Sequence, residues 1–320
     1  MGIKDVTEKN LEGYADVFAD IINVLLFDGR DEIKPAELID SVRRSIYKAD
    51  GKIHEQERDV AKYWVVNGVS IALIGIENQS CIDEYMPIRI ISYDGAAYRN
   101  QIKVRDDIAR RNKNKPDSEK EPIPPIYPVM TLVLYFGDRH WDDQYKHLNK
   151  CLKADTPFAD YLSDYTITVS EIQYLSDETV CKFKSDFKYV ASLFTQYRKV
   201  REGKLDCINI APDQIIHAKE VMELLVVFVG DESFEEAYNQ VLEGGRIDMI
   251  PVFDSLKEQA KREGRAEGRA EGKTEGAKET TALMTKRFFT KSRQLHPDWS
   301  ENRIQQEFDL YFAADNNNEE

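Results

Sequence analysis

Two carboxylates and one carboxamide stand at the ends of two predicted strands and could together hold a divalent cation. Asp59 directly precedes the apolar run Val60–Val66, while Glu77 and Gln79 directly follow the apolar run Val69–Ile76. Carboxylates on adjacent strand ends converge, and Mg²⁺ takes only a few oxygen ligands from protein, the rest coming from water and phosphate. Such an ion lowers the pKa of a bound water and neutralises charge during displacement at phosphorus. These residue types at this spacing therefore indicate metal-assisted phosphate chemistry.

The connection between the two runs sets a geometric condition on this site. Asn67-Gly68 between two runs of β-branched and aromatic residues is a strong signal for a two-residue hairpin turn. In a regular hairpin of this length Asp59 would face Ile76, which places it on the wrong side of the sheet for Glu77. We therefore predict a three-residue turn or a bulge, because one extra residue brings Asp59 opposite Glu77.

Hydrophobic periodicity places further elements around this hairpin. Short apolar strands alternate with helical patterns, which is typical of a mixed α/β sheet. A continuous apolar run is typical of a strand buried on both faces. The predicted elements are a helix over 10–27, a helical turn at Ala36–Val42, a helix from Pro87 to about 108, a polar, proline-rich loop over 110–125, strands at Val129–Phe136 and Tyr165–Val169, and helices at Lys182–Glu202, Pro212–Phe228, Leu283–Phe289 and Glu301–Phe312.

The hairpin and its flanks carry a family resemblance. Asp59 and the strand end Ile76-Glu77-Asn78-Gln79-Ser80 resemble the PD-(D/E)XK nuclease core in its Glu-x-Gln variant. The following Met86-Pro87-Ile88-Arg89, Tyr98, the strand from Tyr127 to Gly137 and the EGRAEG repeat resemble the recombination-promoting nuclease and putative transposase group. The resemblance covers about 10–140.

The resemblance implies a restriction-endonuclease-like mixed sheet flanked by helices, with a helical C-terminal region. It implies that Asp59 and Glu77 bind Mg²⁺ or Mn²⁺ and that Gln79 replaces the superfamily's lysine. Gln79 can position water or phosphate but carries no charge and is no base. A first-helix carboxylate often completes such sites, and the candidates are Asp16 and Asp20, with Glu12 less favoured.

Charge is distributed unevenly along the chain. The net charge of −14 opposes general attraction to nucleic acid, so a DNA partner needs a local basic surface. One basic segment could contact DNA phosphates beside the metal site or could be an ordinary solvated helix face. Its candidate contact residues are Arg99, Lys103, Arg105, Arg110, Arg111 and Lys113.

The sequence also bounds location and organisation. It lacks an apolar signal core and a membrane-span-sized run, and its four cysteines are widely spaced, so we expect a cytoplasmic protein with reduced thiols. We leave open whether it self-associates. The predicted divisions are a nuclease-like core over 1–144, a mainly helical accessory region over 145–256, a charged, weakly helical glycine-repeat connector over 257–280, and a helical segment with a disordered tail over 281–320.

Two functions from different classes follow as hypotheses. The first is a Mg²⁺-dependent DNA endonuclease in which metal-activated water hydrolyses phosphodiester bonds. The alternative is a catalytically inactive module that keeps the nuclease fold and binds DNA or protein. Gln79 in place of a lysine is the feature that keeps this alternative open.

Overall fold

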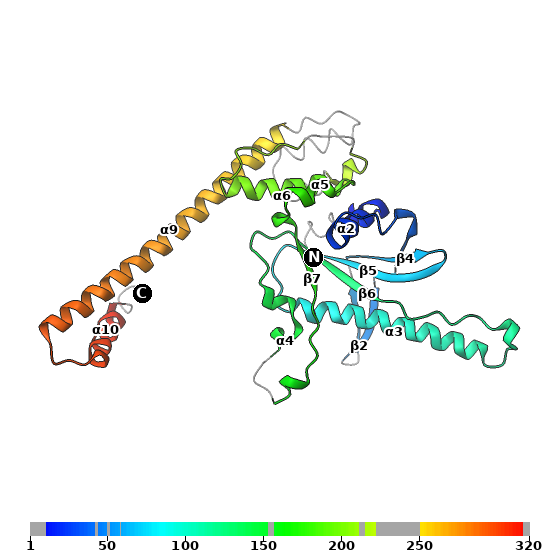
Figure 1. Cartoon of the computed structure of the whole chain (residues 1–320), viewed down its shortest axis with the longest axis horizontal. Helices are drawn as coiled ribbons and strands as arrows, with labels where there is room; N and C mark the ends of the chain where they lie inside the picture. Colours follow the sequence, from blue (N-terminus) through cyan, green and yellow to red (C-terminus); the bar gives the residue numbers. More distant parts are fainter. Residues whose placement is uncertain are drawn as a thin grey trace. The chain divides into compact units, whose positions relative to one another are not determined.

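The computed structural model describes residues 11–41, 44–49, 52–57, 59–152, 157–210, 215–221 and 250–315. They form an α/β fold around a mixed five-stranded sheet (Figure 1), which confirms the predicted α/β class. The chain divides into two compact units, 1–260 and 261–320. The boundary that we expected after residue 144 therefore falls inside the first unit.

The five-stranded sheet has the order β1-β4-β5-β6-β7. β1, β4 and β5 pair antiparallel, whereas β5, β6 and β7 pair parallel. A separate antiparallel pair is formed by β2 and β3. The strands are β1 (Leu38–Asp40), β2 (Arg44–Ala49), β3 (Lys52–Glu57), β4 (Val60–Val66), β5 (Val69–Gln79), β6 (Val129–Tyr135) and β7 (Thr168–Glu171).

Helices connect and flank these strands. Within the described residues no helix combines the length and apolarity that a membrane crossing requires. The α-helices are α2 (Ala15–Phe27), α3 (Met86–Asn112), α4 (Leu148–Cys151), α5 (Asp177–Lys182), α6 (Phe187–Arg201), α9 (Ile250–Leu295) and α10 (Glu301–Asp315). The short 3-10 helices are η1 (Pro35–Glu37), η2 (Asp117–Glu119), η3 (Asp143–Lys146), η4 (Ala159–Tyr161) and η5 (Ile172–Tyr174).

Helices cover both faces of the main sheet. On one face α2, α5 and α6 pack in a core with Leu132 and Leu134 of β6. On the other face Ile90 of α3 packs in a second cluster with Val133 and Tyr135 of the same strand. Side chains from both faces of β6 are thus buried, which confirms the doubly buried strand predicted there.

Several elements differ from the sequence-based prediction. The expected helical turn at Ala36–Val42 is η1 followed by β1, and β2 and β3 occupy a stretch for which we predicted no strands. The expected helix Lys182–Glu202 is α6, which begins five residues later than predicted, and α5 precedes it. In the segment before α6, Asp20 Oδ2 accepts from the backbone N–H groups of Lys184 (2.9 Å) and Ser185 (2.7 Å). Most of the expected helix Pro212–Phe228 lies outside the described residues.

The loop between α3 and β6 is anchored at several points. The Asn112 side chain donates to the Glu121 carbonyl (2.8 Å) and accepts from the Glu121 N–H (2.9 Å). Gln101 makes the same paired contact with the backbone of Tyr127, at 3.1 and 3.0 Å. The Glu121 carboxylate also forms ion pairs with Arg111 (2.9 Å) and Lys115 (3.1 Å). The predicted polar loop is therefore held against the end of α3.

The Glu121 contacts predict an unusually acidic carboxyl group. Hydrogen bonds from Arg111 and Lys115 lower the pKa of Glu121 from 4.5 to about 2. Because the folded-state pKa is depressed, these contacts contribute fully to the stability of the fold above pH 4.5. Their contribution is lost as pH falls through about 2. A ¹³C NMR titration of the Glu121 carboxyl should give this midpoint. Arg111→Gln should raise it, whereas Lys103→Gln should not, and a wild-type midpoint near 4.5 would contradict the expectation.

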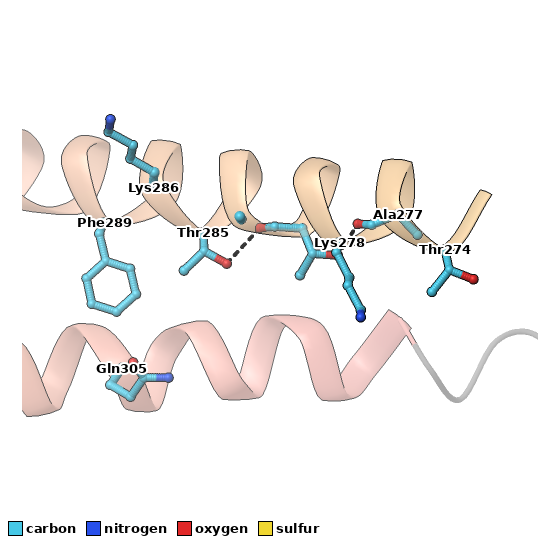
Figure 2. A pocket seen from close by; sticks show the side chains of 9 residues that line it. Thr274, Ala277, Lys278, Thr285, Lys286, Phe289 and Gln305 are labelled. Carbon is cyan, nitrogen blue, oxygen red and sulfur yellow. Dashed lines mark hydrogen bonds between the residues drawn. The ribbon is translucent and has the colours of Figure 1, made fainter. Parts of the chain in front are cut away.

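The second unit contains a helical hairpin. α9 is continuous through the glycine repeat that we expected to be weakly helical, because alanine, glutamate, arginine and lysine between the glycines favour helix. Phe288 and Phe289 of α9 pack against Phe308 of α10, with ring centroids 5.4 and 5.9 Å away. Figure 2 shows the open groove between the two helices, where Phe289 projects toward α10. α10 confirms the helix predicted at Glu301–Phe312.

Candidate active site

The hairpin of β4 and β5 contains the predicted bulge. Asn67 and Gly68 form a two-residue turn with φ values of 51° and 78°, and Val66 pairs with Val69. Val65 pairs with Ser70 but Trp64 pairs with Ala72, so one residue, Ile71, is extra. The shifted register continues to its last pair, Val60 and Ile76, and Asp59 directly precedes this pair while Glu77 directly follows it. The predicted bulge, with one odd residue in the hairpin, is confirmed.

Asp59 and Glu77 are both almost completely buried, with exposures of 5% and 0%. Asp59 Oδ2 accepts from the backbone N–H of Asn78 at 2.8 Å, which ties it directly to the end of β5. Glu77 lies on the α3 side of the sheet, where its Oε1 accepts from the Arg89 guanidinium. A buried carboxylate without a compensating cation is costly, and the Arg89 guanidinium supplies that cation for Glu77.

Arg89 and Tyr93 form one side of this site from the first turns of α3. Arg89 Nε donates to the Tyr93 hydroxyl at 3.1 Å, and Arg89 Nη1 lies 3.8 Å from Asp83 Oδ2. Burial alone would lower the pKa of Arg89, but Glu77 and the bond to Tyr93 raise it. Burial and the charge of Glu77 raise the pKa of Tyr93, which keeps the phenol protonated. The guanidinium is therefore a permanent cation beside Glu77.

Asn78 connects the strand to the residues before α2. It is 3% exposed, and its Nδ2 donates to Glu12 Oε2 at 2.8 Å. Glu12 is itself 1% exposed. Because side chains alternate along a strand, Asn78 points to the α2 side while Glu77 and Gln79 point to the α3 side. Glu12 is therefore the acidic residue from the first helical segment that is bonded to β5.

The two favoured first-helix candidates bond elsewhere. Asp16 contacts Nε2 of His217, at 3.1 and 3.2 Å from its two oxygens. Asp20 bonds to the segment between α5 and α6, as described above. Their carboxylates thus connect α2 to the 184–217 region, and the metal role that we expected for either of them has no support in these contacts.

Gln79 ends β5 and is half-buried. It pairs in register with Tyr135 of β6, and its carbonyl accepts from Phe136 N at 2.8 Å. These backbone bonds fix the strand end on which Glu77 stands. The carboxamide itself is neutral, so the local positive charge comes from Arg89.

The predicted basic segment lies along the second half of α3 and the loop after it. Three of its members are engaged within the protein: Arg105 with the Pro124 carbonyl, Arg110 with Asp107, and Arg111 with Glu121. Over the described part of the chain, Arg99, Lys103 and Lys113 have neither an ion pair nor a side-chain hydrogen bond. These three cations are the ones that remain available to an anionic partner.

The donor set can be compared with the requirements of a divalent cation. No group of three or more histidine, cysteine, aspartate or glutamate side chains within the described residues is arranged to hold a metal. Mg²⁺, however, is commonly bound through one or two carboxylates, with water and substrate phosphate completing its shell. Asp59 and Glu77 fit that lower requirement once Arg89 leaves Glu77.

Sequence reasoning found Asp59 and Glu77 but assigned no role to Arg89 or Asn78. The spacing of Arg89 and Tyr93 (i, i+4) was the available signal, because it places both side chains on one face of α3. Comparison with known proteins adds no further information: no family model, curated protein or solved structure matches this chain.

Proposed function

We propose that this chain is a Mg²⁺- or Mn²⁺-dependent DNA endonuclease of the recombination-promoting, transposase-associated type, acting in the cytoplasm. The observation that carries the proposal is the bulged register that brings Asp59 to the buried end of β5, where Glu77 stands and Asp59 accepts from Asn78 N. The order of α2, the hairpin, α3 and β6, with helices on both faces, supports a restriction-endonuclease-like core.

The residues have distinct roles in this proposal. Asp59 and Glu77 would hold the ion, and Gln79 would orient a water or a phosphate oxygen through its carboxamide. When bound, the ion would supply Lewis acidity, activating water for attack at phosphorus and neutralising the charge that develops there. Arg99, Lys103 and Lys113 would contact the DNA backbone and position the duplex.

The second candidate is a catalytically inactive module that binds DNA or protein. The ion pair of Glu77 with Arg89 favours it, because a guanidinium already compensates the carboxylate that a metal would need. The neutral Gln79 favours it also. Under this hypothesis Arg89 stays on Glu77 in every state of the protein.

A plasmid-nicking assay separates the two candidates. Supercoiled plasmid is incubated with wild-type protein in Mg²⁺, Mn²⁺, Ca²⁺ or EDTA, and retention of labelled duplex is measured in parallel. The endonuclease should produce open-circular and linear product in Mg²⁺ or Mn²⁺ and none in EDTA. DNA retention that is independent of metal and without cleavage would support the inactive module. Cleavage that persists in EDTA would exclude the proposed site.

A further inference from the structure

We infer that Arg89 is the phosphate-binding cation of this site, held on Glu77 until a divalent ion takes over that carboxylate. This inference rests on the proposed function and assigns the positive charge that Gln79 does not provide. Its ligand class is a phosphodiester anion. Arg89 would be a catalytic residue in this scheme, because its guanidinium would contact the reacting phosphate.

The position of Arg89 is the first observation behind the inference. The Glu77 side chain is completely buried, whereas that of Arg89 is 39% exposed, so Arg89 reaches from solvent to a carboxylate that solvent does not touch. Its second carboxylate neighbour, Asp83, is 32% exposed. An anion that approaches from solvent on the α3 side can therefore meet the guanidinium directly.

The geometry of the guanidinium is the second observation. Arg89 Nε donates to the Tyr93 hydroxyl, while the contacts with Glu77 and Asp83 use the terminal nitrogens Nη2 and Nη1, respectively. Release from the two carboxylates would leave this terminal fork available while Tyr93 still orients it. A planar fork of two donors matches the paired oxygens of a phosphate better than an ammonium group does.

Charge balance explains why the exchange would accompany metal binding. With the carboxylates ionised, Asp59, Glu77, Asp83 and Arg89 carry a formal charge of about −2, which repels a phosphodiester. A bound divalent ion brings this sum to about 0 and competes with Arg89 for Glu77. The ion would thus remove the repulsion of the substrate phosphate, and the displaced guanidinium would be beside it.

The first test measures metal affinity without any turnover. Mn²⁺ titrations by calorimetry at pH 8 compare the wild type with Arg89→Gln and with Arg30→Gln, a control that breaks a surface pair with Glu32. Removing the competing cation should strengthen Mn²⁺ binding about tenfold. The control should match the wild type. Unchanged or weaker Mn²⁺ binding by folded Arg89→Gln would overturn the inference.

The second test measures DNA affinity, for which the expected change has the opposite sign. Fluorescence anisotropy with a short labelled duplex in Ca²⁺ should show about tenfold weaker binding by Arg89→Gln. Arg89→Lys keeps a cation and should recover most of that loss. If Arg89→Gln does not fold, Arg89→Met, which keeps a long unbranched side chain, takes its place in both titrations. Equal weakening of Mn²⁺ and DNA binding would overturn the inference.

The outcomes distinguish this inference from the proposed function. Wild-type protein that binds Mn²⁺ and nicks DNA, together with an Arg89→Gln variant unchanged in both affinities, would reject the inference and leave the endonuclease proposal intact. Wild-type protein that binds no Mn²⁺ would reject both.

Discussion

Asp59→Asn and Glu77→Gln are each expected to lower the nicking rate by at least about a hundredfold, because each removes one of two carboxylate ligands from the proposed metal site. Both replacements keep the size of the side chain, and the carboxamide oxygen introduced by Asp59→Asn could still accept from Asn78 N. The loss would therefore report charge and ligand chemistry. The measurement is the initial rate of plasmid nicking in Mg²⁺, with circular dichroism to verify folding.

Neutral replacements of the acidic residues in the first helical segment, Glu12, Asp16 and Asp20, are the matched controls. Asp16→Asn should change the nicking rate by less than about threefold, since its partner is His217. Among Glu12, Asp16 and Asp20 we expect the largest loss from Glu12→Gln, because its carboxylate bonds to Asn78 of β5. A nicking rate within about tenfold of wild type for Asp59→Asn or Glu77→Gln would remove that residue from the site.

Phe194→Ala is expected to lower the free energy of unfolding by about 3–5 kcal/mol, the usual cost of truncating a buried phenylalanine. Phe194 of α6 is 1% exposed, and its ring lies 5.0 Å from that of Phe136, the residue after β6. Because the core joins α6 to the main sheet, the change should shift a single cooperative transition. Chemical denaturation followed by tryptophan fluorescence and by circular dichroism measures this.

Tyr161→Ala provides the contrast from the same half of the chain. Tyr161 is 84% exposed, so its loss should change stability by less than about 0.5 kcal/mol. Two separate transitions, with only one shifted by Phe194→Ala, would show instead that the region after residue 144 folds independently.

The parts of the fold that could be predicted are those encoded locally. Asn67-Gly68 defined the turn, and the need to bring Asp59 opposite Glu77 predicted the extra residue found at Ile71. The unbroken apolar run of β6 predicted burial on both faces. Neighbouring residues carry the signal for the turn and for the buried strand, whereas the bulge followed from the requirement that the expected site placed on Asp59 and Glu77.

The parts that could not be predicted depend on contacts between distant residues. The segment between α5 and α6 is hydrogen-bonded to Asp20, which is more than 160 positions away. The role of Arg89 depends on which face of α3 covers β5, and that of Glu12 on a bond across 66 positions. β1 is only three residues long, and its pairing with β4 stabilises it more than its own propensity does.

The bulge at Ile71 separates the tip of the hairpin from its base. β6 pairs with β5 from Leu73 to Gln79, and β1 pairs with Lys62–Trp64 of β4, whereas the tip beyond Trp64 pairs only within itself. A change in the length of the tip can therefore be accommodated at Ile71 without moving Asp59 or Glu77. This makes the Asn67-Gly68 turn a suitable insertion point for a fluorophore or an affinity tag that follows the site without disturbing it.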